Sequence, residues 1–383
     1  MSPRLIPWLV TAALAAPAVA QPVLRVGPGE PFSTIQAALA AAAPDSVILV
    51  ARAAYSGALT IDRPVRLVAE PGTTVDRLRV TVEGLAPSDF VLLRGFTSTY
   101  PAYQPPVEAL DIDGGTVHVE DCTYTGWTRV SGSVLSVQRS TIGGVDARGQ
   151  SHVALVDSRT EGHAEIVLVY GCYYGCSSYY AYSSVPAVVV TESTVTIAGG
   201  EVQGGEGQLL DQPAIELYSG RVVVTGNTST RIAAGGIYGP PTAAIRTHGG
   251  ELVLDPDPVL VAPIGAPRIS GPARVVRERI PYLRADVEGR ELAVRLNTFA
   301  GANVALLVSP FSPPVSLPIA SVSLWTLPPL VLAAGIVPGS TLWNVRTPLP
   351  SVAAGSVLRM QGLVLRGGAL ALSNPAVTAL EPH

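Results

Sequence analysis

The sequence contains no lysine, so all 25 of its basic residues are arginines. This absence excludes a lysine Schiff base and the lysine of a phosphate-binding loop. Basic and acidic residues nearly balance at a net charge of −4, whereas nucleic-acid-binding surfaces are usually strongly basic. We therefore expect no nucleic-acid partner.

Cysteine is also scarce, with only Cys122, Cys172 and Cys176 in the chain. The last two are close enough in sequence to close a small loop, and we expect a disulfide between them, as an exported protein permits. That pairing leaves Cys122 unpaired; the alternative bonds Cys122 to one of the close pair. A zinc site is disfavoured, because no second cysteine pair completes four ligands.

Charged residues are nearly absent from residues 1–20, where Arg4 precedes an apolar centre and the run Ala18-Val19-Ala20. This pattern is typical of a secretory signal peptide, with cleavage expected before Gln21. The apolar centre is shorter than the roughly 20 residues that a membrane span requires. We therefore expect a secreted or surface-exposed mature protein without a membrane span.

Glycine and proline are abundant, at 38 and 34 residues, and valine-rich runs lie between them. This composition predicts an all-β fold of many short strands separated by turns. Between residues 61 and 263 the pattern recurs in units of unequal length. One unit cannot bury its own apolar face, so stacked units are predicted. The recurring segments are residues 116–126, 134–144, 152–162, 187–200, 214–226 and 244–255.

Residues 32–55 combine a short helix with a buried strand. Ser33 and Gln36 have the spacing of a capping box, and helix-forming residues then continue up to Pro44. Residues 47–50 are too continuously apolar for a strand with one face in water. The helix is predicted to cap one end of the stack.

The same stretch resembles the opening of the right-handed parallel β-helix proteins of the pectin lyase-like superfamily. Those proteins begin with an aromatic-x-T-I-Q-x-A segment, a small-residue helix, an apolar strand and an A-x-Y or G-x-Y turn. The resemblance implies a right-handed parallel β-helix over residues 21–268. It leaves the chemistry open, because the superfamily includes lyases, hydrolases, esterases and adhesins. The residues that carry it are Phe32, Thr34, Ile35, Gln36, Ala38 and Ala54-Tyr55.

Three of the repeated segments align on their last glycine, which places Asp121, Arg139 and Asp157 at the same position of successive coils. Stacked strands lie about 4.8 Å apart, so the three side chains are predicted to form an acid–base–acid ladder. The resemblance implies a catalytic use for it, because polysaccharide lyases of this fold place aspartates around Ca²⁺ and use an arginine in proton abstraction. Asp111 and Asp113 are the candidate Ca²⁺ ligands, and Glu120 and Glu165 are neighbouring carboxylates that could contribute.

The alternative for the ladder is structural. Opposite charges on adjacent strands commonly pair, at roughly 0.2–1 kcal/mol for each pair, without any substrate. The sequence also lacks the adjacent aspartates with downstream G-H-G and R-I-K of polygalacturonases, the G-x-x-D-F-I-F-G of pectinesterases, and the W-I-D-H and R-x-P-x-x-R of pectate lyases. The structural interpretation is therefore favoured.

Tyrosine is concentrated in residues 170–182, which hold six of the 13 tyrosines in the chain. No helix or strand periodicity fits this stretch, so we expect a loop that projects from the stack. Exposed tyrosines suit sugar rings and protein interfaces, because each presents a flat apolar face with a polar tip. The alternative is a loop packed on itself. The candidate binding residues are Tyr173, Tyr174, Tyr179 and Tyr180.

A second domain, a β-sandwich, is predicted for residues 269–383, after a cluster of proline and glycine. Its short strands alternate with turns, and Arg366-Gly367-Gly368 is a hairpin signal. Residues 321–339 are apolar, but prolines interrupt them, so sandwich strands or an extended loop are expected rather than a membrane span.

Two functions of different classes remain. The favoured one is a non-catalytic glycan-binding or structural interaction module, because no complete catalytic constellation can be assembled. The alternative is a polysaccharide-active enzyme, either a Ca²⁺-dependent lyase that uses Arg139 or a glycoside hydrolase that uses two coil carboxylates. For both, the expected partner is an extracellular polysaccharide or cell-surface glycan.

Overall fold

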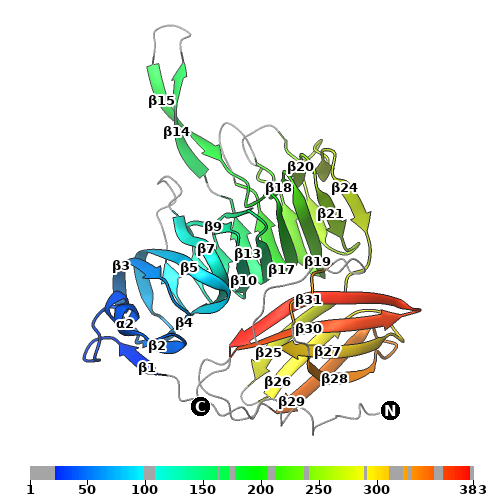
Figure 1. The fold of residues 1–383 in the computed structure, drawn as a ribbon. Helices are drawn as coiled ribbons and strands as arrows, with labels where there is room; N and C mark the ends of the chain where they lie inside the picture. The colour runs from blue at the N-terminus through cyan, green and yellow to red at the C-terminus, as the bar shows by residue number, and fades with distance from the viewer. Residues whose placement is uncertain are drawn as a thin grey trace.

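The computed structural model describes a nearly all-β chain, in which most strands form a long stack and the rest form a smaller sandwich (Figure 1). The prediction of an all-β chain with parallel stacked strands is therefore confirmed. Within the described residues, α2 (Ile35–Ala41) is the single α-helix, and no helix is long and apolar enough to cross a membrane. The predicted signal peptide lies outside the described residues. These are 22–98, 108–162, 164–171, 177–205, 212–236, 241–288, 291–309, 322–326, 330–348 and 357–379.

Parallel hydrogen bonding joins the strands of the stack into successive coils, as in a parallel β-helix. Each coil places an apolar residue directly over its equivalent in the previous coil, and full burial of such a side chain contributes roughly 1.5–3 kcal/mol. One buried column consists of Ile48, Leu67, Leu93, Val119, Val137, Leu155, Ile197, Val224 and Leu254. The strands of the stack are β1 (Val23–Val26), β2 (Ser46–Val50), β3 (Ala54–Ile61), β4 (Val65–Ala69), β5 (Thr74–Arg94), β6 (Thr97–Ser98), β7 (Glu108–Glu120), β8 (Thr123–Tyr124), β9 (Trp127–Ser131), β10 (Val134–Gln138), β11 (Thr141–Ile142), β12 (Val145–Arg148), β13 (His152–Glu161), β16 (Val188–Val190), β17 (Ser193–Gln203), β18 (Ile215–Leu217), β19 (Gly220–Ala233), β20 (Ile245–Thr247), β21 (Glu251–Leu254), β22 (Val259–Val261), β23 (Ile269–Ser270) and β24 (Arg274–Arg277).

Helix α2 begins one residue later than the predicted capping box requires. Its N-cap is Thr34, whose hydroxyl accepts a hydrogen bond from the Ala37 amide at 3.2 Å. Phe32 forms a parallel bridge with Val26, and the chain stays extended through Thr34, so Ser33 does not act as the cap. The buried side of the helix packs into the apolar core of the first coils.

The parallel stacking continues past residue 268. β23 pairs with β20 and β24 pairs with β21, both in parallel. The preceding proline- and glycine-rich stretch contains a turn of the last coil, closed by a 3.0 Å hydrogen bond from the Ala266 amide to the Pro263 carbonyl. The change to antiparallel pairing therefore comes after Arg277 rather than at the predicted boundary.

A two-stranded ribbon projects from the side of the stack (Figure 1). β14 (Ala164–Gly171) and β15 (Ser177–Ser184) pair in antiparallel fashion along their whole length. The prediction of a loop for residues 170–182 was therefore wrong for residues 170–171 and 177–182, which lie in β14 and β15. Tyrosine and serine do not alternate with apolar residues there, and the strand is defined by its backbone pairing with β14.

The C-terminal part of the chain forms the predicted sandwich. One sheet contains β25 (Tyr282–Glu288), β26 (Glu291–Asn297) and β29 (Leu342–Pro348); the other contains β28 (Leu330–Ile336), β27 (Asn303–Ser309), β30 (Val357–Arg366) and β31 (Ala369–Ala379). The hairpin signal is confirmed: Gly367 and Gly368 join β30 to β31 with φ of 56° and 83°, as a tight two-residue turn requires. Residues 330–336, in the apolar stretch, form a sandwich strand.

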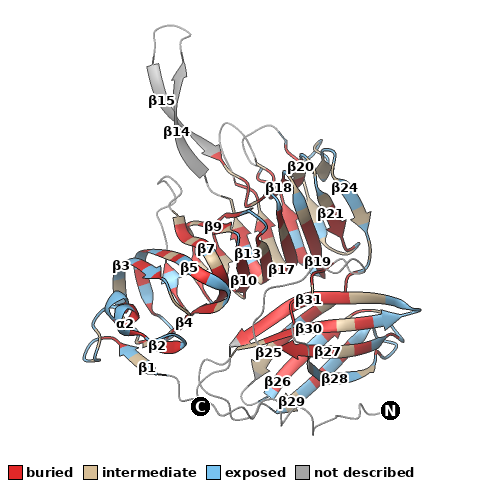
Figure 2. Cartoon of the chain, in the orientation of Figure 1, coloured by how far each residue is buried: buried red, intermediate tan, exposed pale blue. Residues whose placement is uncertain are grey.

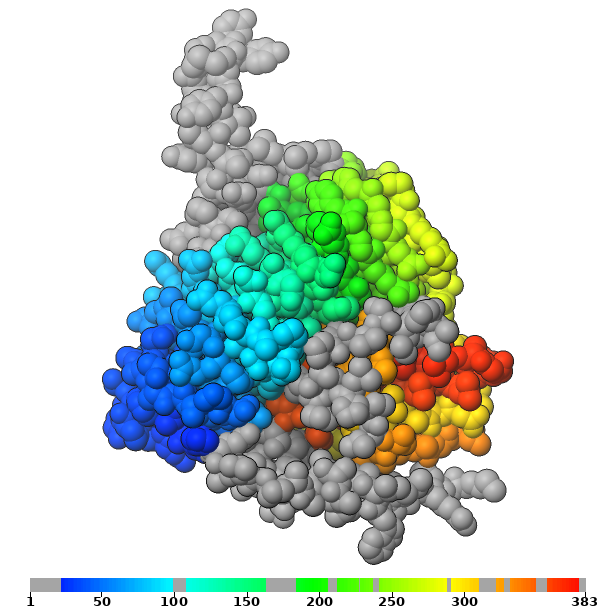
Figure 3. Space-filling model, in the orientation of Figure 1, coloured from blue at the N-terminus to red at the C-terminus, as the bar shows by residue number. Residues whose placement is uncertain are grey.

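The sandwich covers the outer face of one sheet of the stack. β31 lies against β7, β10, β13 and β17 (Figure 1). Trp325 packs with Val134 and Ala154, and Leu372 packs with Val223. Red colouring of these strands in Figure 2 marks the resulting burial, and in Figure 3 orange and red atoms of the sandwich lie directly below green and yellow atoms of the stack. At β7, β10, β13 and β17 this sheet is therefore covered on its outer face as well as its inner face.

Candidate functional site

The predicted ladder lies where the covered sheet of each coil turns into the next sheet. Asp121, Arg139 and Asp157 follow positions that pair in register on β7, β10 and β13. Their φ values of 52°, 48° and 47° show that the backbone turns the same corner three times. The Asp121 amide donates to the Gln138 carbonyl at 3.2 Å, and the Arg139 amide to the Val156 carbonyl at 3.1 Å. The structure thus places the three residues at equivalent positions of successive coils.

Arg139 binds two carboxylates of the preceding coil. Its Nε lies 2.9 Å from Oδ1 of Asp121 and its Nη2 lies 3.3 Å from Oδ2, while Nη2 also contacts Glu120. Burial acts to lower the pKa of Arg139, but the hydrogen bonds and charges of these carboxylates outweigh it and raise the pKa above the ordinary arginine value. The carboxylates of the preceding coil therefore hold Arg139 in its charged form.

Glu120, which was expected only as an additional Ca²⁺ ligand, is the centre of this charged cluster. Its buried carboxylate contacts Arg139 and lies 3.9 Å from Nε of Arg94 and 3.7 Å from Nε2 of His118. Burial acts to raise the pKa of Glu120, but His118 and the two arginines hold it below its usual value. The available signal was the two-residue alternation of His118 and Glu120, which places both on the outer face of β7.

Asp157 contacts the sandwich rather than Arg139. Its Oδ1 accepts a hydrogen bond from the Tyr282 hydroxyl at 2.5 Å, and its Oδ2 lies 3.8 Å from Nε of Arg284. Burial raises the pKa of Asp157 more than these two partners lower it, and burial together with the Asp157 charge raises the pKa of Tyr282. The third member of the ladder therefore joins the stack to the sandwich.

Gly199 occupies the next position of the same corner and leaves room for this contact. A Cβ atom there would overlap Oδ1 of Asp157 and lie 2.9 Å from the Tyr282 hydroxyl. The φ of Gly199 is 77°, which side-chain-bearing residues rarely adopt. The hydrogen bond between Tyr282 and Asp157 thus depends on a residue without a side chain.

An open groove of about 640 Å³ begins at Arg139 and Asp157 and extends over the adjacent sheet. In that sheet Arg159 of β13 pairs in register with Glu201 of β17, and Glu201 pairs with Arg231 of β19. Sequence reasoning missed this row. Arg159 lies within the aligned segment 152–162, so the alignment already contained a signal for it, but the longer coils that follow hide Glu201 and Arg231.

The row is charged and accessible. The side chains of Arg159 and Arg231 are 52% and 45% exposed, and both contact the carboxylate of Glu201 between them. Threonine and serine residues, among them Thr141 and Thr228, add to the lining. Guanidinium and hydroxyl groups in such a row can donate hydrogen bonds to hydroxyl or carboxylate groups of a ligand.

The predicted Ca²⁺ ligands do not join the ladder. Asp111 faces Arg129 of the next coil, with Oδ2 and Nη1 3.9 Å apart, and Asp113 pairs in register with Ser131. A glycine turn separates them from the part of β7 that leads to Asp121. Among the residues that the structure describes, no three acidic, histidine or cysteine side chains gather closely enough to hold a metal ion.

The tyrosine stretch provides no side-chain geometry. Tyr179 and Tyr180 lie in β15, of which only the backbone is described. The remaining predicted residues of this stretch lie outside the described ranges, so the disulfide and the aromatic binding surface stay predictions. These residues are Cys172, Tyr173, Tyr174 and Cys176.

Cys122 is buried in the core of the stack and its thiol is free. Burial raises the pKa of this thiol to about 12. A thiol of such high pKa is unreactive at neutral pH, so Cys122 acts as a small core residue.

No family model and no curated protein match this chain. Two forms of the pectin methylesterase from Aspergillus niger are among the similar solved structures: the penultimately deglycosylated form is 15% identical with a TM-score of 0.35, and the deglycosylated form is 14% identical with a TM-score of 0.26. Each comparison covers 69% of this chain and 87% of the esterase. A multi-modular cell-surface chitinase from Paenibacillus sp. is 12% identical, with a TM-score of 0.17 over 88% of this chain and 24% of the chitinase. These similarities assign no activity to this chain.

Proposed function

We propose that this protein is a secreted, non-catalytic module that binds an extracellular glycan along the groove of Arg159, Glu201 and Arg231. The main support for this proposal is that the charged side chains of the ladder are already bound by other groups of the protein. Arg139 is bound by carboxylates of the preceding coil, and Asp157 is bound by the sandwich. A general acid or base must instead come within about 2.6–3.2 Å of the substrate proton that it transfers.

The groove itself supports binding. Its charged side chains come from successive coils, and the coil spacing of about 4.8 Å repeats hydrogen-bonding groups along a line. Both guanidinium groups stay about half exposed, while Glu161 positions Arg159 and Glu201 positions Arg231. An extended chain of sugars with hydroxyl or carboxylate groups is the ligand that suits such a row.

The alternative, a polysaccharide-active enzyme, is favoured by Asp157. This carboxyl lines the groove, and burial raises its pKa, which is the property of a carboxylic general acid. Its hydrogen bond to Tyr282 would then have to break during turnover.

Binding and turnover can be separated in one experiment. The purified protein is incubated with uronic-acid and neutral polysaccharides, with and without Ca²⁺, and both retention on the polysaccharide and new reducing ends or unsaturated products are measured. We expect retention without products. Products that disappear in Asp157→Asn, while that variant keeps its fold, would establish the enzyme instead.

The variant that tests the groove is Arg159→Ala combined with Arg231→Ala. We expect it to weaken polysaccharide binding by roughly tenfold or more, because hydrogen bonds from charged groups contribute about 1.5–3 kcal/mol each. Arg274→Ala is the matched control, since this arginine is exposed and lies in β24 away from the groove. An equal loss in both variants, as non-specific charge attraction would give, contradicts the proposed site.

We further propose that α2 caps the first coil, as the sequence predicts. Leu39→Ala should lower the free energy of unfolding by about 2–3 kcal/mol, because Leu39 is buried against the core of the first coils. Chemical denaturation measures this loss, and Ala41→Gln on the exposed side of the helix is the control. Unchanged stability in Leu39→Ala would contradict the capping role.

A further inference from the structure

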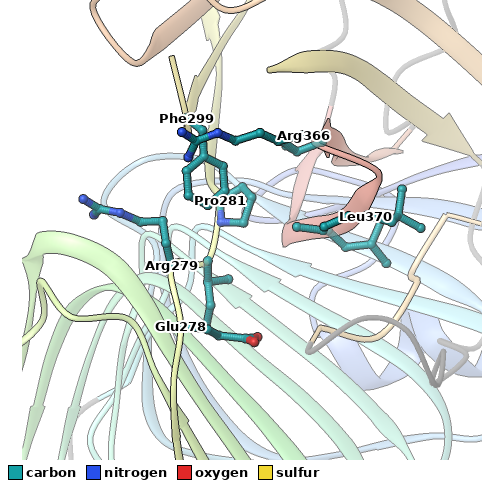
Figure 4. A pocket seen from close by; sticks show the side chains of 11 residues that line it. Glu278, Arg279, Pro281, Phe299, Arg366 and Leu370 are labelled. Carbon is teal, nitrogen blue, oxygen red and sulfur yellow. The ribbon is translucent and has the colours of Figure 1, made fainter. Parts of the chain in front are cut away.

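A second pocket, of about 330 Å³, lies at the junction of the stack and the sandwich (Figure 4). Its walls come from residues 278–281 after the last coil, from Phe299 between β26 and β27, and from both strands of the β30–β31 hairpin. Small-molecule sites typically enclose roughly 300–1,000 Å³, so the pocket has room for a ligand of about one ring and a short chain. It is separate from the glycan groove.

The interior of this pocket is apolar. Ile280, Val364 and Leu372 are buried in its floor. Pro281 and Leu370 form its sides, and Figure 4 shows them facing each other. A ligand must therefore bring an apolar body, whose transfer from water favours binding.

Arg366 supplies the positive charge at the rim. Its guanidinium carbon lies 4.9 Å from the centroid of the Phe299 ring, a cation–π contact that holds it at the pocket. In the part of the chain that the structure describes, Arg366 forms no ion pair, whereas the neighbouring Arg279 contacts Asp255 and Asp257. Arg366 can therefore bind a ligand carboxylate with two parallel hydrogen bonds.

Glu278 limits the ligand to one negative charge. Figure 4 shows Glu278 and Arg366 at opposite ends of the labelled group. A second anionic group near Glu278 would be repelled, whereas a neutral end of the ligand is tolerated there.

We propose that this pocket binds a small organic monocarboxylate, with its carboxylate on Arg366 and its apolar body between Pro281 and Leu370. The pocket combines the guanidinium of Arg366, an apolar floor and the carboxyl group of Glu278 at the opposite end. Together these features favour a monoanion over both a neutral analogue and a dianion.

Isothermal titration of the full mature protein tests this site with three probes: 4-phenylbutyrate, the neutral 4-phenylbutan-1-ol and the dianion 1,4-phenylenediacetate. We expect the monoanion to bind roughly tenfold or more tightly than either analogue, as one charge-assisted contact predicts. Arg366→Gln should remove this preference and leave the weak binding of the alcohol unchanged. Leu370→Trp should abolish binding of all three by filling the pocket.

Arg79→Gln removes an exposed arginine of β5, which does not line the pocket, and should change nothing. Three results would each overturn the proposal: no heat with any probe on the wild-type protein, equal affinity for the acid and the alcohol, or unchanged 4-phenylbutyrate binding in Arg366→Gln. Circular dichroism of each variant confirms that the fold is retained.

Discussion

Glu120→Gln is expected to lower the free energy of unfolding by about 3–5 kcal/mol, the cost of breaking a buried ion pair by removal of one partner. The Glu120 carboxylate is inaccessible to solvent and is shared by Arg139, Arg94 and His118. A glutamine keeps the shape but leaves Arg139 and Arg94 without their buried counter-charge. Urea denaturation measures the loss as a shift of the midpoint at constant slope.

Asp121→Asn is the matched control for this variant. Asp121 is the next residue in the chain and binds the same Arg139, but its side chain is 38% exposed. Asparagine tolerates the φ of 52° at this position, so the backbone is not strained. We expect a loss below about 1 kcal/mol, as for exposed pairs. Equal losses in the two variants would contradict the role of burial.

The effect of Glu120→Gln should also depend on pH. The pKa of Glu120 is lower in the folded protein than in an unfolded chain, so its stabilisation is complete above the unfolded value and is lost as the pH falls through the folded value. The difference between wild type and Glu120→Gln is therefore expected to shrink below about pH 4. A difference that stays constant under acid would show that Glu120 does not act through its charge.

The stack could be predicted because each coil must bury apolar residues at the same positions. Coils of equal length place Asp121 and Arg139 18 residues apart. Alignment on glycine therefore finds both the buried apolar column and the corner that carries the ladder. The alignment fails where a coil carries an insertion. The β14–β15 ribbon interrupts the repeat after β13, and its strand at residues 177–184 has no apolar alternation that periodicity can detect.

The covered face of the stack could not be predicted in the same way. Tyr282 binds Asp157 across 125 residues, and the Val377 amide binds Gln138 across 239 residues. Local periodicity contains no information about such pairs. A weaker signal was present. The outward positions of β10 and β13 include the apolar residues Val134 and Ala154, whereas a face in contact with water usually has polar residues there. Read together with the ladder, they indicate a docking surface rather than a catalytic one.

Gly199→Ala is expected to loosen the sandwich from the stack. The new Cβ would overlap Oδ1 of Asp157, which must turn away and break its 2.5 Å hydrogen bond from the Tyr282 hydroxyl. A charge-assisted hydrogen bond contributes about 1.5–3 kcal/mol, and alanine at a φ of 77° adds about 1–2 kcal/mol of backbone strain. Faster hydrogen exchange at the Val377 amide, which binds Gln138 across the interface, measures the loosening.

Gly301→Ala is the control that separates the effect of the new contact with Asp157 from the effect of backbone strain at positive φ. Gly301 has a φ of 74°, and a Cβ atom there meets nothing within 4 Å, so this variant carries the strain alone. Tyr282→Phe alone should lower the free energy of unfolding by the full value of the hydrogen bond to Asp157. Added to Gly199→Ala it should lower that free energy little further, because the hydrogen bond is already broken. If Gly199→Ala and Gly301→Ala lose the same stability and exchange at Val377 is unchanged, Asp157 does not hold the two parts together and its place at the groove must have another purpose.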